Sequence, residues 1–433
     1  MRARHCLAPS IAFLLACGAD ARKDEQMTAG IDSVSTTAPG GGGTSSGGGE
    51  SSSSEGAGAE ADSGDPAPSD SSSDSGPSNL PKFDIGGNTG ASMDECMSGP
   101  NDDADGDGWT PSTGDCNDCD PNANPGAIEV IITQPNDMGV IPDPADEDCD
   151  GGVDNVEGPC DAGISFDDTD PYNAAAAIGL CHVAEDGEDY GIIDAAWVRA
   201  DGSAVVGGDL QFGIQTDFGP NVAVHEGATM LALSSGHARL PAQVGSCGSL
   251  TCYGTGPGTA PTGFPQDVPA CPGSTAINDD IALEVTLRAP TNATGFSYNF
   301  DFYSFEYPEW VCTSYNDQYI ALVNPPPMGS IDGNISFDSM GNPVSVNIAF
   351  FDVCSGCALG TGELQNTGFD TWDDAGATSW LVTTSPVDGG TELTIRFAIW
   401  DTGDAAWDST VLIDNFRWIA DGAEVDVGTE PEG

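Results

Sequence analysis

The chain has 433 residues, of which 69 are Asp or Glu and only 10 are Lys or Arg, so its formal net charge is −59. Binding to nucleic-acid phosphates requires Lys and Arg, so the large excess of acidic residues argues strongly against nucleic acid as a partner. The same excess argues against electrostatic docking onto anionic lipid. Carboxylates in this number favour either cation binding or a solubilising surface suited to a salty or calcium-rich medium.

The first residues have the pattern of a secretory signal. Arg2 and Arg4 precede an apolar run that is too short to span a membrane. The sequence Leu14-Leu15-Ala16-Cys17 resembles a bacterial lipobox, which implies cleavage before Cys17 and a lipid on that residue. An ordinary secretory signal cleaved nearby is the alternative. We expect residues 1–16 to be the signal peptide, and the protein to be an extracytoplasmic lipoprotein of the outer membrane or cell surface, held to the membrane by lipid on Cys17.

Residues 17–92 follow as a linker that begins with the lipidated cysteine. The stretch from Ala19 to Leu80 contains no aromatic residue, and its centre consists of Gly, Ser, Ala, Pro and acids. Such a segment cannot bury enough apolar area to offset the entropy that ordering would cost. We therefore expect a disordered, flexible tether.

The cysteines favour disulfide bonds. The chain has 14 Cys, and removal of Cys6 with the signal and of Cys17 by lipidation leaves an even number in a secreted chain. CxxC spacing at Cys116 and at Cys354 allows zinc or a thioredoxin-like site as alternatives. An oxidising compartment disfavours the first, and the second lacks a βαβ pattern around it. The sequence leaves the connectivity open.

Residues 93–159, here called the acidic segment, contain two calcium-loop patterns. The first starts with the D-x-D-x-D-G opening, in which carboxylates at alternate positions turn toward one centre and glycine permits the bend. An EF-hand needs Glu at the twelfth position, but here that position is Gly114, so the loop is not an EF-hand. The predicted metal ligands of this loop are Asp103, Asp105, Asp107, Trp109 and Asp115. Further oxygen donors follow at Asn117, Asp118 and Asp120.

The second pattern fits D-x-D-x-D-G-x5-E at every required position. Its predicted ligands are Asp146, Asp148, Asp150, the carbonyl of Gly152, Asp154 directly or through water, and Glu157 as a bidentate ligand. Proline lies on both sides of this loop, so we expect no flanking helices and a loop held by neighbouring cysteines instead.

Together the two loops and the intervening "GDCNDCDPNANPGAIE" resemble the MopE-type metal-binding motif of secreted bacterial proteins, and also thrombospondin type 3 calcium repeats. The first family is named for copper, but residues 94–160 contain no His, and hard carboxylate donors suit calcium. A long insertion between the halves leaves open whether they share one site. The expected cofactor is structural Ca²⁺; acids that merely decorate solvated turns are the alternative.

From Cys160 onward, alternating apolar residues predict β-strands. The alternation is clearest in "IALEVTL" from Ile281, "FSYNFDFYSF" from Phe296, "NPVSVNIAF" from Asn342 and "TELTIRFAIW" from Thr391. One short helix is expected in "DPYNAAAAIGLC". The predicted fold is mainly β, with a jelly-roll-like β-sandwich over residues 160–425 and an acidic tail at 426–433. The acidic segment and the disordered linker precede it.

The phrases "FDFYSFEYPE", "SYNDQY" and "IRFAIWDTGDAAWDSTVLIDNFRW" resemble the bacterial choice-of-anchor L domain over roughly Cys160 to Ala420. The resemblance implies a surface or secreted protein and says little about activity. Further oxygen donors at expected strand ends are additional metal candidates, with turn capping as an equally weighted alternative. They are Glu306, Asn316, Asp317, Asp401, Asp404 and Asp408. Exposed tryptophans would be able to stack on a sugar, although buried packing is the commoner role; the candidates are Trp310, Trp372 and Trp407.

Catalytic motifs are largely missing. "HEGAT" at His225 lacks the second His of a zincin, a G-x-S-x-G match at Gly43 lies in the linker, and no His follows His237 to serve Cys247 as a thiol nucleophile. The sequence favours a non-enzymatic surface protein that uses its sandwich for adhesion or for binding a carbohydrate or protein ligand. A polysaccharide hydrolase with paired carboxylates such as Glu306 and Glu309 is the alternative.

Overall fold

The computed structural model describes residues 99–432, apart from 134, 136–138, 140, 185–189, 349 and 373. All of them belong to one of the chain's two compact units, Pro77–Gly433. The predicted signal peptide, lipidation site at Cys17 and linker lie outside the described residues.

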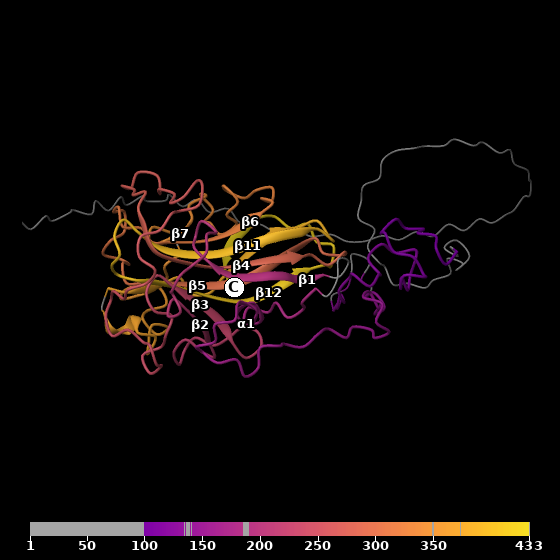
Figure 1. Ribbon diagram of the computed structural model, residues 1–433, viewed down its shortest axis with the longest axis horizontal. Helices are drawn as coiled ribbons and strands as arrows, with labels where there is room; N and C mark the ends of the chain where they lie inside the picture. Colours follow the sequence, from indigo (N-terminus) through magenta and orange to yellow (C-terminus); the bar gives the residue numbers. More distant parts are fainter. Residues whose placement is uncertain are drawn as a thin grey trace, which may run out of the picture. The chain divides into compact units, whose positions relative to one another are not determined.

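The described chain is dominated by two antiparallel sheets (Figure 1), as the mainly β prediction requires. The first, sheet A, has the strand order β1 (Gly191–Val198), β4 (Ile277–Arg288), β11 (Glu392–Thr402), β6 (Gln318–Asn324) and β7 (Val344–Ser345). The second, sheet B, has the order β13 (Gly428–Pro431), β10 (Leu381–Pro386), β5 (Gly295–Ser304), β12 (Ser409–Ile419), β3 (Met230–Ser234) and β2 (Phe212–Gln215). Two short strands, β8 (Val353–Cys354) and β9 (Gly376–Ala377), pair beside β5.

The main hydrophobic core is built by the period-two pattern of the long strands. The alternating aromatics of β5 are all fully buried: Phe296, Tyr298, Phe300 and Phe302. They belong to the same apolar cluster as Leu283 and Val285 of β4 and Phe397 of β11, on the other sheet. Each such side chain contributes about 1.5–3 kcal/mol on burial. Figure 1 shows β6, β11 and β4 in one layer and β5, β12, β3 and β2 in the other.

The predicted strand over 342–350 is only partly correct. Val344–Ser345 forms β7, but a turn follows directly, in which the amide of Ile348 donates to the carbonyl of Ser345. Val344, Val346 and Ile348 are nevertheless buried. Alternating apolar residues therefore marked burial correctly, but this backbone reaches the core through a turn rather than through a strand ladder.

The expected helix is present as α1 (Pro171–Ala176), and a 3-10 turn, η1, covers Phe369–Thr371. The Asp170 side chain caps α1 by accepting a hydrogen bond from the amide of Tyr172, and proline occupies the first turn, where a missing N–H costs nothing. In the described part of the chain, no helix is long and apolar enough to cross a membrane.

Five disulfide bonds join described cysteines: Cys116–Cys149, Cys160–Cys181, Cys247–Cys252, Cys271–Cys312 and Cys354–Cys357. The CxxC pair at Cys354 closes on itself. The other CxxC does not, because Cys116 pairs with Cys149 and so joins the two acidic loops across 33 positions. Cys119 is also disulfide-bonded.

The acidic segment has neither helix nor strand in its described residues, and it docks on the turn between β4 and β5. The amide of Thr291 donates to the carbonyl of Gly126 at 2.8 Å. The side chain of Asn292 forms two bonds with the backbone of Ile128, donating at 2.8 Å and accepting at 3.1 Å. The residues that follow the β4 strand thus hold a loop-rich segment that could not bury a core of its own.

Candidate metal centres

The first acidic loop draws five aspartates into one cluster, here called cluster 1. It consists of two overlapping triads, Asp103–Asp105–Asp118 and Asp105–Asp107–Asp115, and in each triad three carboxylate oxygens lie within 4.8 Å of one another. Asp115, one position beyond the EF-hand's twelfth residue, lies in this group. Asp118 joins it as well, from the turn that contains Cys116 and Cys119.

The loop's backbone is organised by its own aspartates. Asp103 accepts hydrogen bonds from the amides of Gly106 at 2.6 Å and Gly108 at 3.2 Å. Both glycines have positive φ, of 86° and 97°, a conformation that residues with a Cβ rarely adopt. The amide of Trp109 donates to Asp107 at 2.7 Å. The D-x-D-x-D-G spacing therefore turns the chain back on itself and brings the carboxylates to one side.

Two members of cluster 1 are deeply buried and incompletely bonded. Asp115 is 6% exposed and Asp118 is 7% exposed. One oxygen of Asp115 accepts from the amide of Asn117 at 2.8 Å, and one oxygen of Asp118 accepts from the amide of Ala104 at 3.1 Å. The second oxygen of each, and one oxygen of Asp105, is buried without a hydrogen-bond partner.

Burial and mutual repulsion change the acidity of these groups. Desolvation, joined by the charges of Asp107, Asp105 and Asp118, raises the pKa of Asp115 to about 6. Desolvation also raises the pKa of Asp105. Burying a carboxylate without a partner is costly, so the arrangement calls for a cation or for protons.

The second acidic loop forms a smaller group, cluster 2, from Asp146, Asp148 and Glu129. Glu129 lies upstream of the loop and was absent from the predicted ligands. One of its oxygens accepts from the amide of Asp154 at 2.7 Å, and the other is buried without a partner. Desolvation, with the charges of Asp148 and Glu147, raises the pKa of Glu129 to about 7.

The remaining predicted ligands of the second loop lie outside cluster 2. Asp150 accepts from the amide of Gly152 at 2.6 Å and from the side chain of Asn155 at 2.9 Å, while Glu157 lies 3.5 Å from His182. Asp154 contributes its amide to Glu129 rather than a carboxylate to the cluster. Cys149, tied to Cys116 in the middle of the loop, has a φ of 57°, and Asp154 has a φ of 52°. Of the ligands predicted for this loop, Asp146 and Asp148 therefore lie together with Glu129, while Asp150, Asp154 and Glu157 make the other contacts described here.

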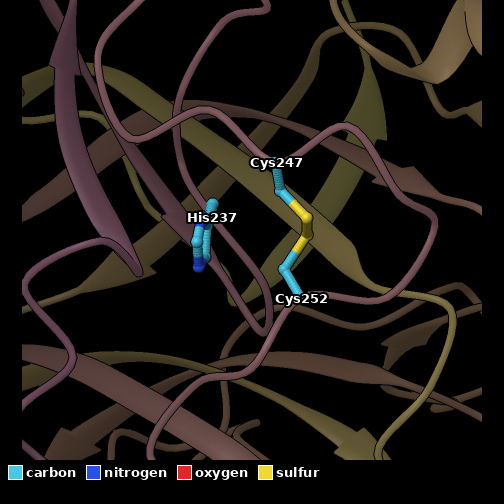
Figure 2. A group of neighbouring side chains, drawn as sticks. All are labelled: His237, Cys247 and Cys252. Atoms are coloured by element: carbon cyan, nitrogen blue, oxygen red, sulfur yellow. A yellow bond between two sulfur atoms is a disulfide. The ribbon is translucent and has the colours of Figure 1, made fainter.

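A third group of potential ligands, His237, Cys247 and Cys252, is not a metal site. Figure 2 shows the two sulfur atoms joined in a disulfide beside the imidazole ring. A thiolate is the species that ligates metal, and neither sulfur carries one. His237 instead lies 2.8 Å from the carbonyl of Gly245 through Nδ1, a structural contact.

The additional candidates in the sandwich are all buried except Asp404, and they differ in how their oxygens are used. Asn316 is used locally, since its oxygen accepts from the amide of Asn347 at 3.1 Å, and Asp404 is exposed. Four others are almost completely buried at one end of the sheets: Glu306, Asp317, Asp401 and Asp408. Among described residues, no three carboxylate oxygens of this group approach within 4.8 Å of one another, in contrast to the acidic segment.

The three predicted tryptophans lie together. Ring centroids of Trp310 and Trp407 are 5.4 Å apart, and those of Trp372 and Trp407 are 5.8 Å apart, both edge to face. Tyr315 packs on Trp310 at 5.3 Å. Trp372 is 39% exposed, and the other two are half-buried. Trp407 of this aromatic cluster directly precedes Asp408, one of the buried carboxylates.

Comparison with known protein families finds a similarity within the sandwich. Residues 258–416 match the family model of the Choice-of-anchor L domain. The match runs from just before β4 into β12 and is shorter than the range over which the sequence resembles the domain. The acidic segment and strands β1 to β3 of the chain precede the Choice-of-anchor L match. No curated protein matches the chain.

Proposed function

We propose that this protein is an extracytoplasmic surface protein, anchored by lipid on Cys17, whose acidic segment binds calcium and whose sandwich serves in adhesion or ligand binding without catalysis. The Choice-of-anchor L match supports the surface location. Five disulfides in the described chain suit an oxidising compartment outside the cytoplasm.

One observation carries the calcium proposal. Asp115 and Asp118 are more than nine-tenths buried, and each keeps one oxygen without a hydrogen-bond partner in a cluster of five aspartates. In native proteins such groups are paired, and here the described neighbours offer only more carboxylates. A bound cation would supply the missing partner for all of these oxygens at once.

The donor set favours calcium over the other biological metals. Clusters 1 and 2 contain only carboxylates, with neither imidazole nor thiolate, and hard oxygen donors select Ca²⁺, Mg²⁺ or Mn²⁺ over copper. Calcium accepts six to eight oxygens in flexible geometry, whereas magnesium demands an octahedron with several waters. Irregular loops that present five aspartates to one centre suit calcium.

Calcium binding would order the segment as well as fill a site. The Cys116–Cys149 disulfide joins the two loops, so ordering of one restricts the other. An ion that binds only the folded form stabilises it in proportion to the logarithm of its concentration. We therefore propose a structural role for the metal.

The test uses the full-length chain with Cys17→Ser, which removes lipid attachment, exported so that disulfides form. Calcium titration should raise the melting temperature and give saturable heat in calorimetry. Asp115→Asn should remove most of this response, and Asp143→Asn, an exposed acid with the same charge change, should leave it unchanged. Tight copper binding without a calcium response would refute the assignment.

For the sandwich, the aromatic cluster supports a ligand-binding role, because clustered tryptophans with one partly exposed member offer a flat face for a sugar. The hydrolase alternative receives less support. Its two acids differ in environment, since Glu306 is buried and Glu309 is exposed, so they do not face one open cleft together.

A further inference from the structure

Four carboxylates from both sheets meet at one end of the sandwich. Trp400 pairs with Gln318 in the β11–β6 ladder, so the next residue of one strand, Asp401, lies beside the preceding residue of the other, Asp317. From sheet B, Glu306 follows β5 and Asp408 precedes β12. These four residues are called the inter-sheet cluster below.

Hydrogen bonds connect the inter-sheet cluster across the sandwich. The hydroxyl of Ser409, in sheet B, donates to one oxygen of Asp317, which directly precedes β6 of sheet A, at 2.7 Å. The other oxygen of Asp317 accepts from the amide of Thr402 at 3.0 Å, and the amide of Asp317 lies 3.5 Å from a carboxylate oxygen of Glu306. Both sheets therefore place oxygen donors in one small volume.

Several of these oxygens have no partner. Asp401 is 1% exposed, and neither of its carboxylate oxygens makes a hydrogen bond of normal geometry. The carboxyl of Asp317 and the hydroxyl of Ser235 lie near enough to Asp401 to affect its pKa. Asp408 accepts from the amide of Cys252 at 2.8 Å through one oxygen, and its other oxygen is buried and unpartnered. Asp401 is thus a buried polar group directed at other acids.

No basic side chain of the described chain neutralises the inter-sheet cluster. The arginines that form ion pairs, Arg199, Arg288 and Arg396, contact Asp280, Glu392 and Glu284. Two histidines pair with Glu157 and Glu432. The nearest further charges are again acids: Asp279 lies close enough to raise the pKa of Asp401 and Asp408, and Asp404 that of Glu306.

Several negative charges buried close together require a cation or protons to offset them. Burial is the main cause that raises the pKa of Glu306 and of Asp408 to about 9, and repulsion by the charge of Asp401 adds to it. A proton shared between Asp401 and Asp317 would lower the charge and bridge that pair, but it would leave the buried second oxygen of Asp408 without a partner. A divalent cation both neutralises the charge and coordinates the oxygens.

We propose that the inter-sheet cluster binds a divalent cation of the calcium type through Asp401, with Asp317, Glu306 and Asp408 as further ligands. The carboxylates are spaced more widely than in the acidic segment, which leaves room for the water ligands that calcium commonly retains. Because two ligands come from each sheet, the ion would fasten sheet A to sheet B at this end. The site is separate from clusters 1 and 2 and does not depend on their binding calcium.

The experiment separates this site from the acidic segment by silencing the latter. The parent is the full-length chain with Cys17→Ser, Asp105→Asn, Asp115→Asn and Glu129→Gln. Calcium binding is measured by calorimetry, and terbium, a luminescent calcium substitute, is excited through the neighbouring tryptophans. We expect the parent to bind about one equivalent of calcium. Adding Asp401→Asn should weaken that binding at least tenfold, and the exposed control Asp388→Asn should not change it.

A second variant keeps the proposal testable if Asp401→Asn does not fold. Trp407 precedes Asp408 and is part of the aromatic cluster, but its side chain is not a ligand. Trp407→Phe should lower terbium emission excited at the tryptophan band while leaving the calcium affinity unchanged. A silenced parent that binds no calcium, calcium binding that persists in folded Asp401→Asn, or a silenced parent whose bound terbium shows no tryptophan-excited emission would each overturn the inter-sheet site.

Discussion

The side-chain amide of Asn124 donates a hydrogen bond of 2.9 Å to Asp107, and this contact ties cluster 1 to the sandwich. The carbonyl oxygen of the same side chain accepts from the hydroxyl of Thr291 at 2.7 Å and from the amide of Gly126 at 3.0 Å. Asn124 is completely buried. Asn124 therefore bridges the β4–β5 turn and a carboxylate of cluster 1, and it fixes one relative to the other.

Asn124→Ala should destabilise the docked segment and weaken calcium binding at cluster 1. The substitution removes four hydrogen bonds from a buried site and leaves Thr291 and Asp107 short of partners, at a cost of roughly 1–3 kcal/mol for each group left unsatisfied. Chemical unfolding and calcium calorimetry measure the two effects. The exposed Asn221→Ala, in the sandwich, is the control, and equal calcium affinity in both variants would contradict the role given to Asn124.

Removal of the Cys116–Cys149 disulfide should weaken both acidic clusters together. The bond closes 33 residues, and in the chain-entropy view a loop of this size is worth about 3–4 kcal/mol. Cys116→Ser with Cys149→Ser should therefore shift the calcium titration to higher concentration and broaden it. The matched change at Cys354 and Cys357, which closes only three positions, should leave the titration unaltered.

Asp301 should make stability depend on pH. It is fully buried in β5, and desolvation, helped by the charge of Glu363, raises its pKa to about 7. Since the unfolded pKa is lower, the folded state binds the extra proton. The stabilisation is complete below the unfolded pKa and is lost as pH rises through about 7.

Asp301→Asn keeps the oxygen that accepts from the hydroxyl of Thr378 at 3.1 Å, and it cannot ionise. The difference in pKa corresponds to something on the order of 4 kcal/mol, so the free energy of unfolding of the variant should rise relative to that of the parent from about pH 4 to 7, and the gain should level off above about pH 8. Urea unfolding at fixed calcium measures this gain. A parallel pH profile for the two proteins would show that Asp301 does not titrate in this range; Asp388→Asn controls for the change in net charge.

The aromatic cluster should contribute to ligand binding if the sandwich recognises carbohydrate. Trp372 is its most exposed member, so Trp372→Ala should remove a stacking face without emptying the core. A glycan array followed by affinity measurements on any bound sugar should show a several-fold loss. Tyr253→Ala, which removes a 92% exposed aromatic ring, is the control. Equal losses in the two variants would place recognition elsewhere.

The sequence predicted individual strands and loops better than the contacts between residues far apart in the chain. Period-two aromatics at Phe296 to Phe302 predicted β5, because alternation alone decides which side of a strand is buried. The same rule failed after Ser345, where burial is reached through a turn. The convergence of Asp103, Asp105 and Asp107 follows from spacing of two residues within one loop.

Residues that complete the clusters from a distance were harder to find. Glu129 joins Asp146 and Asp148 from 17 residues upstream of Asp146, and nothing in its immediate sequence distinguishes it from other acids. The disulfide at Cys149, whose partner the sequence left open, shapes that loop. The acids of the inter-sheet cluster were found as strand-end residues, but the unpartnered state of Asp401 depends on both sheets and has no local signal.

The last strand, β13, affects whether sheet B can pair with a strand of a second molecule. Residues 426–433, expected as an acidic tail, contain β13, which pairs with β10 and forms one edge of sheet B. An open edge invites another strand, but Pro431 has no N–H to offer, and Glu430 carries a negative charge beside it. This edge of the larger sheet is thereby protected against pairing with the same edge of a second molecule.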